Sequence, residues 1–451
     1  MSNILDLPPR YRRIDRAMFR VSLFLVSVGM LAASQAAVAA PAAKPTVPTG
    51  FTITKVADPP EGTGNCDDLG FLDGNLFLGC KNKTTSSGEG GNSTLVEYTP
   101  AGAIVQTWSI KHQIDGLAGD PLRHQMIVSL DENENALMAT VKPSAPAVRQ
   151  VTYYNLSPDP RAATTPIALR TGGGTNHVAV DAAGHVLVSA SNGQAITATA
   201  VFKVALAPPS SPSGIGTAAL SLTFLNNAIA TKGNDGTGTI PLHLTDVDSA
   251  AIVPTSSPRF GGSYVVSDQT ALELVFANNI FNGTGLTVLK MPYGVDDLVW
   301  TTSPAGTLYV VDFGVSAELP KIAASALWKV TGPFTTNMVL ASNDGEADQV
   351  VKVNLTTGAL TPFIRHLNTT KGLVYLNPDG SHTALPLNGA SAVPVSSKTT
   401  IDTTRKNSTG STSSALIVVL VVVVLLVVGG GFAMMRRRTA SRTVTPKEVN
   451  G

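Results

Sequence analysis

The chain has 451 residues, of which 43% are hydrophobic and 14% are charged, with 41 glycines and 29 prolines. This composition is typical of a globular, turn-rich chain and excludes an intrinsically disordered one, which would carry more charge and fewer apolar residues. The formal net charge of +1 gives no electrostatic reason to bind nucleic acid. An aromatic content of 6% argues against a surface that stacks on carbohydrate.

The first predicted element is a secretory signal peptide over residues 1–39. A basic stretch ends at Arg20, an apolar run follows from Val21 to Leu31, and residues 37–39 form a small-residue cleavage site. Residues 40–50 contain two prolines and predict an extended linker. The alternative is that the apolar run remains attached as an anchor helix.

Residues 51–393 are expected to form an extracytoplasmic domain built from a repeat. Each copy opens with a short strand carrying Asp or Asn, turns, and continues as a second strand rich in Val, Leu and Tyr. Five copies are visible: 67–69 leading to 75–78, 115–117 leading to 125–128, 176–178 leading to 185–188, 248–250 leading to 262–266, and 296–298 leading to 307–311. Further strand-like runs follow each pair, so that four antiparallel strands make one propeller blade.

A sixth unit is degenerate in sequence. Residues 348–355 and 359–364 are expected to be outer strands of the fifth or sixth unit, and residues 372–375 resemble another opening strand. Residues 51–57 are a candidate for the closing strand, which would remove an exposed sheet edge. The insertion 208–240 is expected to be an exposed loop. No long stretch of helical periodicity occurs in the domain.

By this repeat, and by the fragment DGLAGDP at residues 115–121, residues 51–390 resemble the NHL-like and gluconolactonase-like six-bladed β-propellers. The resemblance implies an all-β fold, a β-propeller of about six blades with the last one degenerate, and it supports a fold more than a function. A pair of β-sandwiches would show the same short strands and is the alternative fold.

In a propeller the first strand of each blade lines the central channel, so the residues that open the repeats would converge there. The expected ring consists of Asp67, Asp115, Asn176, Asp248 and Asp296. Oxygen ligands from several blades, with no Cys or His required, suit calcium as a cofactor. The sequence therefore suggests an axial calcium site.

The resemblance to gluconolactonase-like enzymes implies that such an ion would polarise a lactone or a phosphoester. His177, Asp68 and Asp297 would then be the candidate catalytic bases. The competing interpretation is structural: Asp and Asn are favoured in turns before strands because their side chains bond nearby backbone amides.

Cys66 and Cys80 are the two cysteines of the chain, and they flank a predicted hairpin that turns at Asp73 and Gly74. Outside the cytoplasm we expect them to form a disulfide. No C-x-x-C, G-x-S-x-G or H-E-x-x-H motif occurs, and no other cofactor is expected.

The C-terminal part predicts a membrane anchor. Residues 394–414 are rich in Ser and Thr and predict a flexible stalk. Residues 415–435 are an almost unbroken Val/Leu/Ile run without charge, followed by three arginines at 436–438. At 1.5 Å per residue the run is about 31 Å long as a helix, so we expect a transmembrane helix with a cytoplasmic tail at 436–451.

Together these features predict a single-pass membrane protein that displays a β-propeller on the cell surface. Its function would be that of a binding or protein-interaction module, with an extracellular protein or a small ligand as partner. The alternative function is a calcium-dependent hydrolase of the lactonase or phosphoesterase kind.

Overall fold

The computed structural model describes residues 44–390, apart from 86–88, 131–136, 161–163, 167–168, 171–173, 191–197, 212, 235, 315–324 and 344–348. All described residues belong to one compact unit. The predicted signal peptide, stalk, transmembrane segment and tail lie outside the described residues. No helix within the described ranges is long and apolar enough to cross a membrane.

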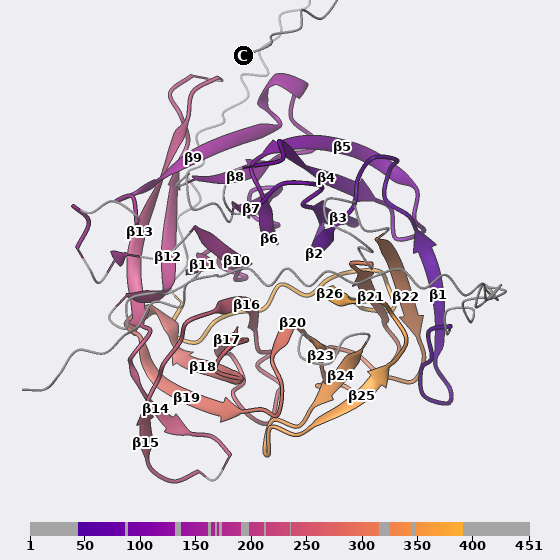
Figure 1. Cartoon of the computed structure of the whole chain (residues 1–451), viewed down its shortest axis with the longest axis vertical. Helices are drawn as coiled ribbons and strands as arrows, with labels where there is room; N and C mark the ends of the chain where they lie inside the picture. The colour runs from indigo at the N-terminus through magenta and orange to yellow at the C-terminus, as the bar shows by residue number, and fades with distance from the viewer. Residues whose placement is uncertain are drawn as a thin grey trace, which may run out of the picture. The chain divides into compact units, whose positions relative to one another are not determined.

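The described residues form an all-β, propeller-like structure in which sheets surround a common axis (Figure 1). Six innermost strands form a ring, each contacting the next and the last contacting the first. They are β2 (Cys66–Leu72), β6 (Ile114–Asp120), β10 (Thr175–Val180), β16 (Val247–Ile252), β20 (Val295–Trp300) and β26 (Thr370–Leu376). The all-β class is confirmed, and the β-sandwich alternative is wrong because the inner strands form one closed ring, in which each unit packs against two neighbours.

The first four inner strands each begin a unit of consecutive antiparallel strands. The first unit adds β3 (Asn75–Cys80), β4 (Asn92–Tyr98) and β5 (Ile104–Lys111), and the second adds β7 (Gln125–Leu130), β8 (Leu137–Val141) and β9 (Val151–Ser157). The third adds β11 (Val186–Ala190), β12 (Thr199–Ala207) and β13 (Gly216–Leu225), and the fourth adds β17 (Tyr264–Asp268), β18 (Glu273–Asn279) and β19 (Thr284–Lys290). The first four predicted strand pairs are therefore confirmed.

The β2–β3 hairpin shows why the sequence folds as predicted at this point. Leu72 pairs with Asn75, which leaves Asp73 and Gly74 as a two-residue turn. Both have a positive φ, 48° and 90°, the conformation of the tight turns that match the twist of a hairpin. At the other end of the hairpin the two cysteines are cross-strand neighbours and form the predicted disulfide.

The segment 208–240 is not the exposed loop that we expected. It contains β13 and β14 (Ile229–Lys232), and β15 (Thr239–Pro241) begins at its end. Strands β14 and β15 extend the sheet of the fourth unit beyond its outermost strand, β19. Strand β13 pairs in parallel with β9 and so joins the sheets of the second and third units. Buried and exposed positions alternate along much of β13, the period of a half-buried strand, which the flanking Pro, Ser and Gly residues obscure in the sequence.

The fifth and sixth units exchange strands, which contradicts the predicted fifth hairpin. Strand β20 pairs with β23 (Val339–Asn343), whereas β21 (Thr307–Asp312) pairs with β22 (Ala326–Thr331) and β26. The fifth unit is completed by β24 (Val350–Val353) and β25 (Leu360–Ile364). Both strands of the predicted hairpin exist, but β21 belongs to the neighbouring unit, where it lies between β22 and β26.

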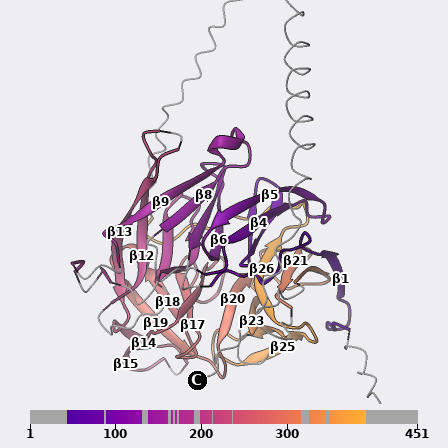
Figure 2. The same ribbon diagram turned by 45° about the horizontal axis from the view of Figure 1, so that its top comes forward.

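Strand β1 (Thr52–Ala57) pairs with β22 and is the outermost strand of the sixth unit, as the closing strand was predicted to be. Six apolar clusters fill the six spaces between neighbouring units, so the core is divided around the axis. Helical structure in the described ranges includes the short 3-10 turns η1 (Ala147–Arg149) and η3 (Ile280–Asn282). Figure 2 shows the same arrangement from a tilted direction.

Candidate functional site

Each inner strand carries an irregularity in its pairing near its start. In β2, Asp67 is the extra residue between the pairs formed by Cys66 and Asp68. A register shift interrupts β6, β10, β16, β20 and β26 at the equivalent point. Such β-bulges turn side chains out of the regular alternation and are frequent beside functional sites.

The bulges place one polar residue of every inner strand at an equivalent position. These residues are Asp67, Asp115, Asn176, Asp248, Asp296 and Lys371. The first five are the predicted ring. Lys371 was missed because the predicted sixth inner strand began at Gly372, whereas β26 begins at Thr370.

Two lysines pair with the predicted ring residues. Lys81, which directly follows β3, lies 2.5 Å from Asp67 and also contacts Asp115. The ammonium group of Lys371 lies 2.6 Å from Asp296 and 3.8 Å from Asp67. The chain itself therefore supplies cations to the ring.

Gln269, which directly follows β17, links two further acids. Its side-chain amide donates to Asp248 and, over 3.4 Å, to Asp296. Asn176 is different: it is 5% exposed, and its Oδ1 has no hydrogen-bond partner within the described residues. The structure thus joins the four aspartates of the ring through Lys81, Lys371 and Gln269.

The three predicted candidate bases lie one position further along their strands. His177 Nδ1 is 3.7 Å from Asp68 Oδ1. Asp297 accepts hydrogen bonds from the Ser249 hydroxyl at 3.3 Å and from the backbone N–H groups of residues 298 and 373 at 2.7 Å and 2.6 Å. Asp297 therefore ties β16, β20 and β26 together at the axis.

Burial and crowding raise the pKa of several of these carboxyl groups. Burial raises the pKa of Asp68 well above its usual value, and the charges of Asp67 and Asp297 raise it further. Burial also raises the pKa of Asp248 to about 6 and that of Asp297 to about 7. Burial alone would raise the pKa of Asp67 too, but Lys81 and Lys371 hold it below the usual value.

His177 is the histidine that lies beside these carboxyl groups. Burial lowers its pKa to about 4, against a smaller opposing effect of the Asp67 charge. The ring of His177 is consequently neutral at pH 7. It can accept or donate a hydrogen bond but contributes no positive charge to the carboxyl groups beside it.

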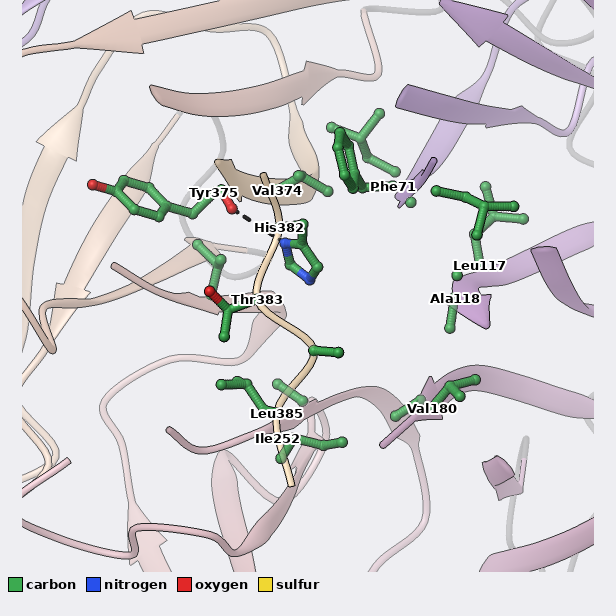
Figure 3. Close-up of a pocket in the computed structure, with 18 of the residues that line it drawn as sticks. Phe71, Leu117, Ala118, Val180, Ile252, Val374, Tyr375, His382, Thr383 and Leu385 are labelled. Carbon is green, nitrogen blue, oxygen red and sulfur yellow. Dashed lines mark hydrogen bonds between the residues drawn. The ribbon is translucent and has the colours of Figure 1, made fainter. Parts of the chain in front are cut away.

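An axial cavity of about 520 Å³ lies between the inner strands, on the side of their C-terminal ends. All six inner strands line it, with apolar side chains that include Phe71, Leu117, Val180 and Ile252 (Figure 3). His177 and Asp297 also line it, so two of the polar groups described above lie at one end of the cavity. A largely apolar cavity of several hundred cubic ångströms with a few polar groups is the usual form of a small-molecule site.

Residues 377–390, here called the crossing segment, leave β26 and pass over the cavity at the end opposite the carboxyl groups (Figure 3). The carbonyl oxygen of Leu385 accepts a hydrogen bond from the Ala182 N–H at 2.9 Å, which fixes the segment to the third unit. Leu387 is 5% exposed and packs into the core between the third and fourth units. The segment is therefore part of the folded domain.

His382 of the crossing segment lines the cavity (Figure 3). Its Nδ1 lies 3.2 Å from the carbonyl oxygen of Tyr375, and its ring lies 5.8 Å from that of Phe71. This residue was not predicted from the sequence, because the segment shows neither strand nor helix periodicity.

Within the described ranges, no group of three or more His, Cys, Asp or Glu side chains is arranged to hold a metal ion. The ring aspartates make ion pairs and amide hydrogen bonds instead. The structural interpretation of the repeat placed these residues in turns before the strands, whereas they lie in bulges within the inner strands.

No family model and no curated protein matches the sequence. Among solved structures, a protein of unknown function from Bacteroides caccae is 10% identical with a TM-score of 0.37, over 69% of this chain and 86% of that chain. The virginiamycin B lyase from Staphylococcus aureus is 8% identical with a TM-score of 0.36, over 67% and 85% of the two chains. A luciferin-regenerating enzyme is 13% identical with a TM-score of 0.30, over 64% and 98%. Similarities at these scores establish no family and no activity.

Proposed function

We propose that this chain is a membrane-anchored binding module, in which a six-bladed β-propeller outside the cytoplasm takes a small ligand into its axial cavity. The cavity carries this proposal, because all six inner strands converge on a largely apolar space of about 520 Å³ that has polar groups at one end. The internal pairing of the ring aspartates with lysines favours binding over metal-dependent catalysis, since it leaves fewer carboxylate oxygens open to an ion.

A cavity-filling variant tests this proposal. Ala118 of β6 is half-buried and lines the cavity, so Ala118→Phe reduces the space available to a ligand. The full-length chain in detergent would be screened by thermal shift against small apolar and amphipathic molecules. We expect ligands that raise the melting temperature of the wild type but not of this variant.

The control is Ala103→Phe, at an exposed alanine in the turn between β4 and β5. This variant should bind the same ligands as the wild type. Ligands that stabilise Ala118→Phe and the wild type equally would contradict a site in the axial cavity.

We also propose that residues 1–39 direct export and that residues 415–435 span the membrane once, with 436–451 in the cytoplasm. The disulfide between Cys66 and Cys80 supports an oxidising compartment for the domain. Protease added to intact cells should digest the domain and leave an epitope fused after residue 451 protected. Protection of the domain itself would contradict this topology.

A calcium-dependent lactonase or phosphoesterase is the second candidate function. His177 favours it, because an imidazole that is neutral at pH 7 beside a buried carboxyl is suited to general-base chemistry. Stoichiometric calcium binding to the full-length chain, lost in Asp115→Ala/Asp296→Ala and accompanied by hydrolysis of a lactone or phosphoester, would support this function. Absence of calcium binding would exclude it.

A further inference from the structure

The axis contains more acids than the lysines around it can neutralise. We call the six carboxyl groups the axial carboxyl cluster: Asp67, Asp68, Asp115, Asp248, Asp296 and Asp297. The ammonium groups of Lys81 and Lys371 contact Asp67, Asp115 and Asp296. Within the described residues, six carboxyl groups therefore share the two ammonium groups.

Asp68 is the least satisfied member of the axial carboxyl cluster. It is 8% exposed, and its Oδ2 has no hydrogen-bond partner within the described residues. Its Oδ1 lies 3.7 Å from His177, whose imidazole is neutral at pH 7 because burial lowers its pKa to about 4. A buried carboxylate without a partner is costly, so a cation placed beside Asp68 would stabilise the ionised cluster.

The axial cavity beside these carboxyl groups is large enough to hold a molecule that carries a positive charge. His177 and Asp297 line the cavity, and Asp68 lies directly beside His177. Away from this end Phe71 and Trp300 contribute aromatic rings, whose faces attract cations, and Asp73 and Asp379 contribute further carboxyl groups. A volume of about 520 Å³ far exceeds that of a bare ion and suits a small organic molecule.

We propose that the axial cavity binds a small organic cation, an ammonium or guanidinium group on an apolar body. The charged group lies at Asp68 and Asp297, and the apolar body lies between the inner strands. This inference rests on the proposed function, because it names the class of ligand that the same cavity takes.

Three probes of nearly the same size and different charge test this inference: 2-phenylethylammonium, 2-phenylethanol and phenylacetate. Their affinities for the full-length chain in detergent would be measured by calorimetry at pH 8. We expect the ammonium to bind at least tenfold more tightly than the alcohol, and phenylacetate to bind most weakly. Equal affinities, a preference for phenylacetate, or no binding of the ammonium would overturn the inference.

The charge of Asp68 is tested by Asp68→Asn, which keeps the shape of the side chain. This variant should lose at least tenfold in affinity for the ammonium and keep the wild-type affinity for the alcohol. The matched control is Asp58→Asn, at an exposed aspartate paired with Lys55 on the outside of the molecule, and it should bind all probes as the wild type does. Equal behaviour of the two variants would contradict a role for Asp68.

The outcomes separate this inference from the proposed function. If the alcohol or phenylacetate binds as well as the ammonium and Ala118→Phe abolishes binding, the cavity is a ligand site but not a cation site. If no probe binds and no molecule of the wider screen distinguishes Ala118→Phe from the wild type, both fail. The comparison of probes on the wild type does not depend on the folding of any variant.

Discussion

Lys81 is held between two carboxylates at the axis, with 20% of its side chain exposed. Replacing it by Met leaves Asp67 and Asp115 buried without their shared cation. Because an unpaired buried charge is costly, Lys81→Met should lower the free energy of unfolding by about 3 kcal/mol, as measured by denaturant titration. Lys55→Met is the control: it removes an ion pair whose side chains are 44% and 66% exposed, and it should change stability by less than about 1 kcal/mol. Similar losses in both variants would contradict the structural importance of the axial pair.

Asp248 makes stability depend on pH in a defined window. Its pKa is raised by burial from 3.8 to about 6, so the unfolded chain releases this proton at a lower pH than the folded chain does. Stability contributed by the neutral carboxyl is therefore lost as the pH rises from about 4 to about 6, by up to about 3 kcal/mol.

Asp248→Asn removes that contribution because the amide does not titrate. The melting temperature of this variant minus that of the wild type should rise between pH 4 and pH 6 and level off above. His177 has the opposite sign in this window, because burial lowers its pKa to about 4, but it is present in both proteins and largely cancels from the difference. A difference that does not change with pH would contradict the raised pKa.

At the residue scale the sequence predicted the acids of the axis but not their partners. The acids recur at one point of a repeated pattern, whereas Lys81 and Gln269 occur once each, at the ends of the second strands of two different units. The second strand of a unit runs antiparallel to the first, so its last residues lie beside the bulge at the start of the first strand. Residues that directly follow a second strand are therefore expected near the axis, and Lys81 and Gln269 are two of them.

At the element scale the exchange of strands between the fifth and sixth units can be tested by cross-linking. Val310 of β21 pairs with Leu373 of β26, so Val310→Cys/Leu373→Cys should form a second disulfide under oxidising conditions. Leu298→Cys/Tyr309→Cys is the control, because the hairpin expected from the sequence would bring these residues together whereas the structure places them in different apolar clusters. Mass spectrometry of non-reduced peptides distinguishes the two. A cross-link in the control alone would show that β20 and β21 pair with each other.

The sequence could not predict this exchange. A hairpin of β20 with β21 and a hairpin of β21 with β22 both satisfy the same local pattern of a strand, a turn and a strand. The pairing of β21 with β26 joins residues that are distant in sequence, such as Val310 and Leu373, and no local pattern reports it. The closing strand β1 was predictable for the opposite reason, since an open sheet edge must be covered.

At the scale of the whole molecule the crossing segment links the axis to the rim. Leu387 is buried between the third and fourth units, and Leu387→Ala should lower the free energy of unfolding by about 2 to 4 kcal/mol through lost apolar burial and the cavity left behind. Pro386 is not buried, so Pro386→Ala tests whether any change in the segment has the same effect. A Leu387→Ala variant as stable as the wild type would show that the segment does not pack as described.

The overall plan followed from the repeat, because alternating apolar strands separated by turns at a regular spacing admit few arrangements. The axial cavity could not be predicted from the repeat. Its size depends on how far six inner strands stand apart and on a crossing segment that has no periodic signal, and both are set by packing between residues distant in sequence.

The central claim is that a ligand enters the axial cavity and is held at its polar end. The most direct measurement is a crystal structure of the chain soaked with 2-phenylethylammonium. We expect to find the ammonium group beside Asp297 and Asp68, with the ring between the inner strands near Phe71. Density for the ligand only on the outer surface, in crystals whose cavity is open to solvent, would contradict it.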